Sequence, residues 1–376
     1  MGETAESEAR GRAWAEIDLG ALARNYRAIR ARAGDKRVIA VVKANAYGHG
    51  ALLATRALVG AGCDAFAVIS VEEAAELRSA GVAEPVLVLG GVQSRADADA
   101  ALALDVEAVV SRVEALDWLE AAAGRAGRVA RFQLELDTGM GRLGVLPDEL
   151  PAFLERIAGA RHARLSGVMS HLACADDAAS PETGRQRKLF AELVARVRAA
   201  GLRPEWVHMD NSAGIARGPS DGSDAVRPGI SLYGVDPTLE GGHAGEPVMS
   251  LCARVVHAKT VAAGTPIGYA AEFRAAERTR ILTLGIGYAD GLPRAAGGRA
   301  AVAVRGRRAP LVGRISCDLA TAAVPPDDPS AAGDVALVFG RRDGLDVPVE
   351  DLARAVGTIS YEVLARIGPR VPRLAT

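Results

Sequence analysis

The feature that most constrains the fold is an eightfold alternation between short apolar segments and longer segments of helical periodicity, from about residue 20 to residue 229. The apolar segments are hydrophobic almost throughout, which is typical of parallel strands covered on both faces. We expect helices at Val71–Ala80, Arg112–Ala123 and Pro181–Ala200. The candidate strands are Arg37–Val42, Ala65–Ile69, Pro85–Leu89, Glu107–Val110, Ala130–Asp137, Arg164–Ser170, Trp206–Met209 and Ala225–Pro228. The pattern predicts a closed TIM-type (β/α)8 barrel, with a doubly wound open sheet as the alternative.

The pattern changes after the Gly- and Pro-rich segment Pro237–Pro247. From there on the expected strands are shorter, glycine turns separate them, and one helical stretch remains, Glu350–Ile367. We therefore expect a barrel over residues 13–244 and a mostly β domain over residues 245–376, with which Trp14–Leu19 could pair. Residues 1–12 are polar and lack the features of a signal peptide, so we expect a disordered tail there.

Composition narrows the function classes. A formal net charge of −1 offers no broad field for nucleic acid or an anionic membrane. No apolar segment approaches the ~18 residues that a membrane span needs. The four cysteines are scattered, with no CxxC pair and no nearby His cluster at metal-ligand spacing. This argues against a disulfide framework or structural zinc, so we expect no metal, and it favours a reducing, cytoplasmic location. We expect a small-molecule partner.

The apolar run Val38–Val42 leads directly to Lys43, and a loop with Asn45 and two glycines follows. Burial of a lysine lowers its pKa and makes the amine a nucleophile for carbonyl groups. The alternative is a surface lysine at a strand end.

Other polar residues also follow candidate strands. Residues at the carboxyl ends of parallel barrel strands converge on one mouth of the barrel. Taken singly, a strand-end histidine is usually a satisfied polar residue, and Asn211-Ser212 is usually a helix cap. Their occurrence at successive strand ends favours a shared site that contains Lys43, Tyr47, Arg142, His171, His208, Asn211, Ser212, Arg227, Gly229 and Ile230.

Two of these segments favour a phosphate. Asn211 and Ser212 open a predicted helix, Ala213–Arg217, and Gly229-Ile230 allows close backbone approach. Together they offer hydroxyl and N–H donors where barrels often bind phosphate. No GxGxxG or P-loop motif accompanies them, so no nucleotide is implied. Beside a nucleophilic lysine, the phosphate suggests pyridoxal 5′-phosphate (PLP).

With these motifs the chain resembles the PLP-dependent, barrel-type (fold type III) alanine racemases. The resemblance runs in the family's order from about Trp14 to Pro372. It implies a homodimer with shared active sites that interconverts L- and D-alanine and supplies D-alanine for peptidoglycan. The matching segments are Ala40–Gly50, Leu136–Gly144, Gly167–Ala173, His208–Ser212, Arg227–Gly234, Gly268–Tyr269, Gly285–Arg294, Gly313–Asp318 and Ile359–Glu362.

The resemblance also implies roles for single residues. Lys43 binds PLP covalently and acts as one base, and Tyr269, from the partner subunit, acts as the second. Arg227 faces the pyridine nitrogen, and Arg142 lies near the phenolic oxygen and the substrate. The residues that bind the phosphate are Tyr47, Ser212, Gly229, Ile230 and Tyr361. His171 and His208 order the second base, Tyr269, and Arg227, while Cys317 and Asp318 contact the substrate. The access corridor is lined by Asp176, Tyr288, Arg294, Arg314 and Asp318.

These residue types suit the chemistry. Racemisation needs two bases on opposite faces of a planar carbanion. A free tyrosine has a pKa of about 10 and is a poor base at neutral pH, so it needs neighbours such as His171 and Arg227. An arginine will not protonate the ring nitrogen, which limits side reactions such as transamination.

Two positions depart from the family. Glu135 stands where many members carry a lysine modified to a carbamate, and we expect its carboxylate to pair with Arg142. The alternative is that Glu135 faces solvent. Cys317 stands where methionine often frames the substrate carboxylate, which predicts a larger pocket and broader tolerance, including serine.

The alternative functions are a serine or broad-specificity racemase, a PLP decarboxylase, a non-catalytic PLP-binding protein and a cofactor-independent barrel enzyme. Decarboxylases carry an acidic residue where this chain has Arg227, and PLP carriers lack the second domain. A cofactor-independent enzyme leaves Lys43 unexplained.

Overall fold

The computed structural model describes residues 11–376, which form two compact units by their contacts. One unit contains Leu22–Ala46 and Ala51–Glu246. The other contains the described residues up to Ala21 together with Tyr47–Gly50 and Pro247–Thr376. Most of the expected tail, residues 1–10, lies outside the described residues.

The first unit is a barrel of eight parallel strands in the order β8-β7-β6-β5-β4-β3-β2-β9. Two hydrogen bonds join the ends of this sheet, from Asp224 N to the Val207 carbonyl (2.7 Å) and from Arg227 N to the Asp210 carbonyl (2.9 Å). These bonds bring the two edge strands together in a nearly closed barrel, which excludes the open-sheet alternative. The strands are β2 (Arg37–Val41), β3 (Ala65–Val68), β4 (Val86–Val88), β5 (Glu107–Val110), β6 (Ala130–Glu135), β7 (Ala163–Met169), β8 (Trp206–His208) and β9 (Ala225–Val226).

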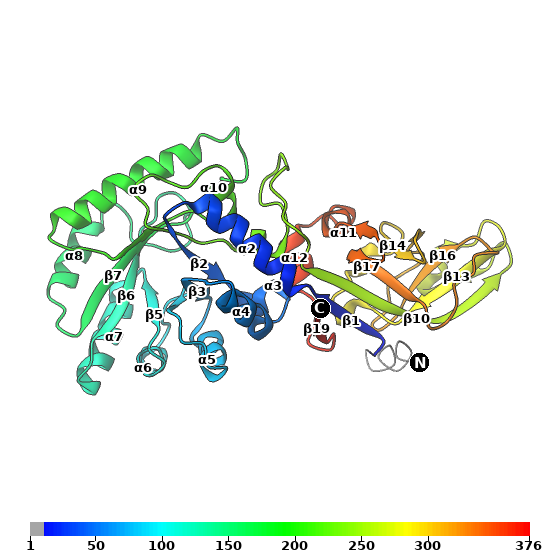
Figure 1. The fold of residues 1–376 in the computed structure, drawn as a ribbon, viewed down its shortest axis with the longest axis horizontal. Helices are drawn as coiled ribbons and strands as arrows, with labels where there is room; N and C mark the ends of the chain where they lie inside the picture. Colours follow the sequence, from blue (N-terminus) through cyan, green and yellow to red (C-terminus); the bar gives the residue numbers. More distant parts are fainter. Residues whose placement is uncertain (1–10) are drawn as a thin grey trace. The chain divides into compact units, whose positions relative to one another are not determined.

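Helices surround these strands (Figure 1). Local sequence explains where they begin: Ser70 and Ser94 accept hydrogen bonds from Glu73 N and Asp97 N and so cap α5 and α6. The helices are α2 (Leu19–Ala33), α4 (Ala51–Gly60), α5 (Val71–Ser79), α6 (Arg95–Ala103), α7 (Val113–Ala126), α8 (Leu150–Ala158), α9 (Glu182–Ala199) and α10 (Ser212–Ala216). No helix in residues 11–376 has the length and apolar character that crossing a membrane requires.

The second unit is mostly β, as expected. Its main sheet runs β15-β14-β17-β10-β1-β19, with β13, β16 and β18 attached. The predicted pairing of the Trp14 segment is confirmed, because β1 is antiparallel to β10 with Trp14 opposite Cys252. The strands are β1 (Ala13–Ile17), β10 (Met249–Val261), β11 (Pro266–Ile267), β12 (Phe273–Arg274), β13 (Thr279–Leu284), β14 (Ala301–Val304), β15 (Arg307–Pro310), β16 (Ala320–Val324), β17 (Val335–Arg342), β18 (Leu345–Val347) and β19 (Arg373–Ala375).

Two details of this unit differ from expectation. The helical stretch over Glu350–Ile367 is two helices, α11 (Val349–Val356) and α12 (Ser360–Ala365), because Gly357 adopts a left-handed conformation (φ 74°) that ends α11. Arg12, at the end of the expected tail, donates from Nη1 and Nη2 to the buried Asp290 carboxylate at 2.9 and 2.7 Å.

Candidate functional site

Lys43 follows β2 and begins a left-handed turn, α3 (Lys43–Tyr47). Ala44, Asn45, Ala46 and Tyr47 have φ values of 53°, 54°, 54° and 50°. Left-handed backbone costs a residue with a Cβ about 1–2 kcal/mol, and of the residue types in this turn only Asn adopts it occasionally. Surrounding contacts must therefore stabilise this turn.

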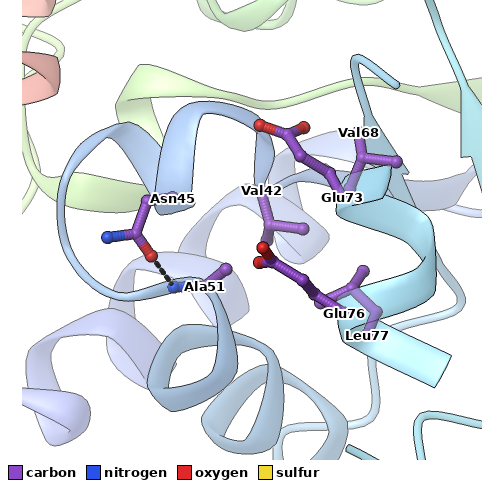
Figure 2. Close-up of a pocket in the computed structure, with 7 residues that line it drawn as sticks. All are labelled: Val42, Asn45, Ala51, Val68, Glu73, Glu76 and Leu77. Carbon is purple, nitrogen blue, oxygen red and sulfur yellow. Dashed lines mark hydrogen bonds between the residues drawn. The ribbon is translucent and has the colours of Figure 1, made fainter. Parts of the chain in front are cut away.

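Glu73, in the first turn of α5, supplies one such contact. Its Oε1 accepts a hydrogen bond from Ala44 N (2.8 Å), and its Oε2 accepts one from Ile69 N (2.9 Å). Asn45 Oδ1 accepts a hydrogen bond from Ala51 N at 2.7 Å. Figure 2 shows Glu73 and Asn45 at a pocket of about 330 Å³ that Glu76 also lines. The Glu73 side chain thus holds the start of the turn after Lys43, and the Asn45 side chain ties the turn to the start of α4.

The Lys43 side chain is partly buried. Burial lowers the pKa of its ammonium group, and the positive charges of Arg142 and Arg227 lower it further, while Glu73 opposes them. This environment favours the neutral amine. It supports a nucleophilic lysine over a surface lysine at a strand end.

Arg227 is buried, and the ends of β7 and β8 hold it. Its Nη1 donates to His208 Nδ1 (2.5 Å), and its Nη2 donates to the carbonyl groups of Ser170 (2.6 Å) and Met209 (3.2 Å). Burial lowers the pKa of Arg227 to about 10, against the effect of Glu135 and Asp210. The guanidinium therefore stays cationic at neutral pH.

His171 lies beside Arg227, with its Nδ1 at 3.4 Å from Arg227 Nη2 and its Nε2 at 3.5 Å from Asn211 Nδ2. Burial, with the charges of Arg227, Arg142 and Lys43, lowers the pKa of His171 to about 3. His171 is thus a neutral imidazole in this cluster of cations.

Ser212 and Gly229 meet, as the sequence predicted for a phosphate site. Ser212 Oγ accepts hydrogen bonds from Gly229 N (2.9 Å) and Ser231 N (3.3 Å) and lies 3.0 Å from Ser231 Oγ. Ile230 begins a 3-10 turn there, η1 (Ile230–Tyr233). Asn211 is the helix cap of α10, because its Oδ1 accepts from Gly214 N (3.0 Å). The convergence of backbone N–H and hydroxyl donors is the donor chemistry of an anion site.

Glu135 does not form the expected ion pair. It is 5% exposed, so the solvent-facing alternative is excluded, yet its Oε2 has no hydrogen-bond partner within residues 11–376. Burial raises the pKa of Glu135, while Arg227 and Arg142 act in the opposite direction. Arg142 is exposed, on a loop that Asp137 orders by accepting from Gly139 N (2.9 Å). Any influence of Glu135 on Arg142 in this structure therefore acts through space.

The remaining predicted residues lie in the second unit, except Asp176, whose carbonyl accepts from Arg217 Nη2 (3.0 Å) in the barrel unit. The rings of Tyr47 and Tyr361 meet edge to face, with centroids 6.1 Å apart. Tyr269 and Tyr288 are 68% and 49% exposed, and neighbouring Cys317 raises the pKa of Tyr288.

Two of the charged residues expected in the access corridor form ion pairs with other residues of the second unit. Arg314 pairs with Glu272, and Asp318 pairs with Arg370 at 2.8 Å. Arg294 begins a 3-10 turn, η4 (Arg294–Ala296).

Several polar residues around these side chains were not predicted from the sequence. Glu73 braces the turn after Lys43, and Gln133 binds His208 by a 2.7 Å hydrogen bond between its Oε1 and His208 Nε2. A signal for Gln133 was present, because Arg131, Gln133 and Glu135 are polar at every second position of an otherwise apolar strand.

Nearly the whole chain is similar to known alanine racemases. Residues 17–237 match the model of the alanine racemase N-terminal domain, and residues 248–375 match that of the C-terminal domain. The alanine racemase of Symbiobacterium thermophilum is 40% identical over 96% of both chains. Among solved structures, alanine racemase from Streptomyces lavendulae superposes with a TM-score of 0.93, 38% identity and 97% coverage of both chains. The enzyme from Bartonella henselae, solved with covalently bound pyridoxal phosphate, has a TM-score of 0.87 and 30% identity, with 97% of this chain and 100% of that chain covered. The chain belongs to the alanine racemase family of enzymes.

Proposed function

We propose that this alanine racemase works with PLP and two bases, Lys43 and Tyr269 of the partner subunit. The observation that carries the proposal is the environment of Lys43. The pKa of Lys43 is lowered, and Lys43 follows a barrel strand, as Arg227 and the Ser212–Gly229 cluster follow other strands of the barrel.

The residues present fit the cofactor. Lys43 would bind it covalently, Arg227 would face its ring nitrogen, and the donors around Ser212 and Gly229 would bind its phosphate. PLP, when bound, supplies an electron sink that acidifies the Cα–H bond of an amino acid. The solved relative with covalently bound pyridoxal phosphate supports this assignment.

Each base has a defined task. Lys43 Nζ, whose lowered pKa favours the neutral amine, takes or returns the Cα proton on one face of the substrate. The phenolic oxygen of Tyr269 of the partner subunit does so on the other face. Arg227 keeps its own protons, since its pKa of about 10 lies well above neutral pH, and so it does not protonate the ring nitrogen.

Membership of the family supports further assignments for the substrate, the active form and the location. We propose alanine as the substrate, D-alanine for peptidoglycan as the product, a homodimer as the active form and the cytoplasm as the location. Exposed Cys317 supports a second candidate, racemisation of serine, because its side chain is shorter than the methionine common in the family at this position.

The test is racemisation of L-alanine, and separately of L-serine, in deuterated water, following chirality and Cα exchange. We expect inversion and exchange with wild-type protein and loss of both in Lys43→Ala. Lys36→Ala is the matched control, since Lys36 lies just before the opposite end of the same strand and donates to the Ser223 carbonyl (2.8 Å). Exchange without inversion would show that the second base does not act. Faster turnover of serine than of alanine would make the serine assignment the correct one.

A further inference from the structure

A continuous series of hydrogen bonds crosses the barrel interior from Glu107 on β5 to Arg227. Gln133 Nε2 donates to Glu107 Oε2 at 2.8 Å. His208 Nε2 lies 2.7 Å from Gln133 Oε1, and Arg227 Nη1 lies 2.5 Å from His208 Nδ1. Gln133, His208 and Arg227 are buried. The interior polar groups of β5, β6 and β8 are therefore linked in one series.

The local backbone is built for this series. The pairing of β6 with β7 shifts register after Phe132, so Phe132 pairs with Leu165 and Gln133 with Gly167. Ser166, the extra residue of this β-bulge, donates from Oγ to Glu107 Oε2 at 2.8 Å. A Cβ on Gly167 would lie 2.8 Å from Gln133 Cδ, so the glycine leaves space for the glutamine side chain.

The chemistry of the groups fixes the direction of every bond. An ionised carboxylate only accepts, so the Gln133 amide must turn its NH2 group toward Glu107 and its oxygen toward His208. That oxygen also only accepts, so His208 Nε2 must carry a proton. Since a guanidinium only donates, His208 Nδ1 must hold the lone pair that accepts from Arg227.

We propose that Gln133 is a positioning residue that fixes His208 as the Nε2–H tautomer and thereby orients Arg227, while Glu107 orients the Gln133 amide. This role rests on the proposed function only in placing Arg227 against the cofactor ring. Burial and the charges of Arg227 and Arg37 lower the pKa of His208 well below its usual value, in agreement with a neutral ring. With His208 held as this tautomer, its Nδ1 always accepts the hydrogen bond from Arg227 Nη1, which keeps the guanidinium in one orientation.

The test is the tautomer of His208 in full-length protein labelled with ¹⁵N-histidine, by long-range ¹H–¹⁵N correlation with and without added PLP. The chain has six histidines, so loss of one signal in His208→Gln assigns His208. We expect the Nε2–H tautomer in wild-type protein. An Nδ1–H tautomer or a doubly protonated ring would overturn the proposal, and this measurement needs no variant at Gln133.

Gln133→Met, close to glutamine in volume, tests the acceptor. We expect a mixture of tautomers and a kcat about tenfold lower, the size expected when one hydrogen bond is lost, with KM little changed. Ser166→Ala is the matched control, because it removes a hydrogen bond to the same Glu107 oxygen and leaves both Gln133 bonds in place. It should keep the tautomer and most of kcat. An unchanged His208 signal in Gln133→Met contradicts the proposal, whereas absence of racemase activity in wild-type protein contradicts only the proposed function.

Discussion

At the scale of single residues, Glu135 combines burial with an incomplete set of hydrogen bonds. Glu135 is 5% exposed, and its Oε2 has no hydrogen-bond partner within the described residues. The nearby charges of Arg227 and Arg142 favour the carboxylate, while burial favours the neutral acid and raises the pKa. Because Arg142 forms no ion pair with it, the contribution of Glu135 is the negative charge that it places near two arginines.

Glu135→Gln keeps the shape and removes that charge. We expect weaker cofactor binding and a kcat lower by about three- to tenfold, the size of an interaction with a charge worth roughly 1 kcal/mol. Absorbance titration with PLP and steady-state kinetics measure both. Glu114→Gln, at an exposed position of α7, is the control for removing a carboxylate. Equal cofactor affinity and turnover in Glu135→Gln and wild-type protein would show that Glu135 does not act on Arg142.

The same variant has a signature in stability. Since the pKa of Glu135 is raised in the folded protein, the folded state binds more protons than the unfolded state at pH values above the usual glutamate pKa of 4.5. Its contribution therefore destabilises the fold progressively as the pH rises through this window. Urea unfolding of wild-type protein and Glu135→Gln should show the difference in free energy shifting in favour of the variant from pH 4.5 upward.

At the scale of elements, the strands were predictable and the turn after β2 was not. Each candidate strand overlaps an observed barrel strand, because an apolar segment between helical segments is a local signal. The Ala44–Tyr47 turn has no such signal, since alanine and tyrosine prefer right-handed backbone. Glu73 holds the turn from a different element, and only the pairing of β2 with β3 brings the two together.

The site divides in the same way. Lys43, Arg142, Ser212 and Arg227 can be chosen as candidates from the sequence, because each follows a strand or belongs to a motif. The alternation of polar residues in β6 marks Gln133, but its hydrogen bonds and those of Glu107 could not be predicted, since they depend on strand register and on the bulge at Ser166. The lack of an ion pair between Glu135 and Arg142 could not be predicted either, because the residue types do not give the distance between the two side chains in the fold.

Glu73→Gln tests the brace on the turn. The change removes one charge and replaces one acceptor by an NH2 group, so one of the two backbone N–H bonds is lost. We expect a loss of stability of about 1–2 kcal/mol. Glu73 also raises the pKa of Lys43, so without its charge the acid limb of kcat should move to lower pH.

Glu76→Gln is the control, because Glu76 lines the same pocket and makes no bond to the turn (Figure 2). Thermal unfolding and pH–rate profiles measure the two effects. If Glu73→Gln and Glu76→Gln behave alike in both assays, the brace has no role in the state of Lys43.

At the scale of the whole molecule, the two proposed bases belong to different units. Lys43 is partly buried in the barrel unit, whereas Tyr269 belongs to the second unit and is 68% exposed. A base needs a defined environment to work near neutral pH, and at this exposure most of the Tyr269 side chain lies in solvent. A second copy of the chain could supply one, and in a twofold dimer each copy would complete the site of the other.

A mixed dimer tests this arrangement. Lys43→Ala and Tyr269→Phe are each expected to be inactive as homodimers. Co-expressed with different affinity tags and isolated as the heterodimer, they leave one site with both bases intact, so activity should recover to about half that of wild-type dimer. The matched control is a heterodimer of Lys43→Ala with the Lys43→Ala/Tyr269→Phe double variant, in which no site has both bases. Recovery in the first heterodimer and none in the second requires that Tyr269 act across the interface, because neither chain of the active heterodimer carries both residues. An inactive first heterodimer would mean that each chain uses its own tyrosine or none.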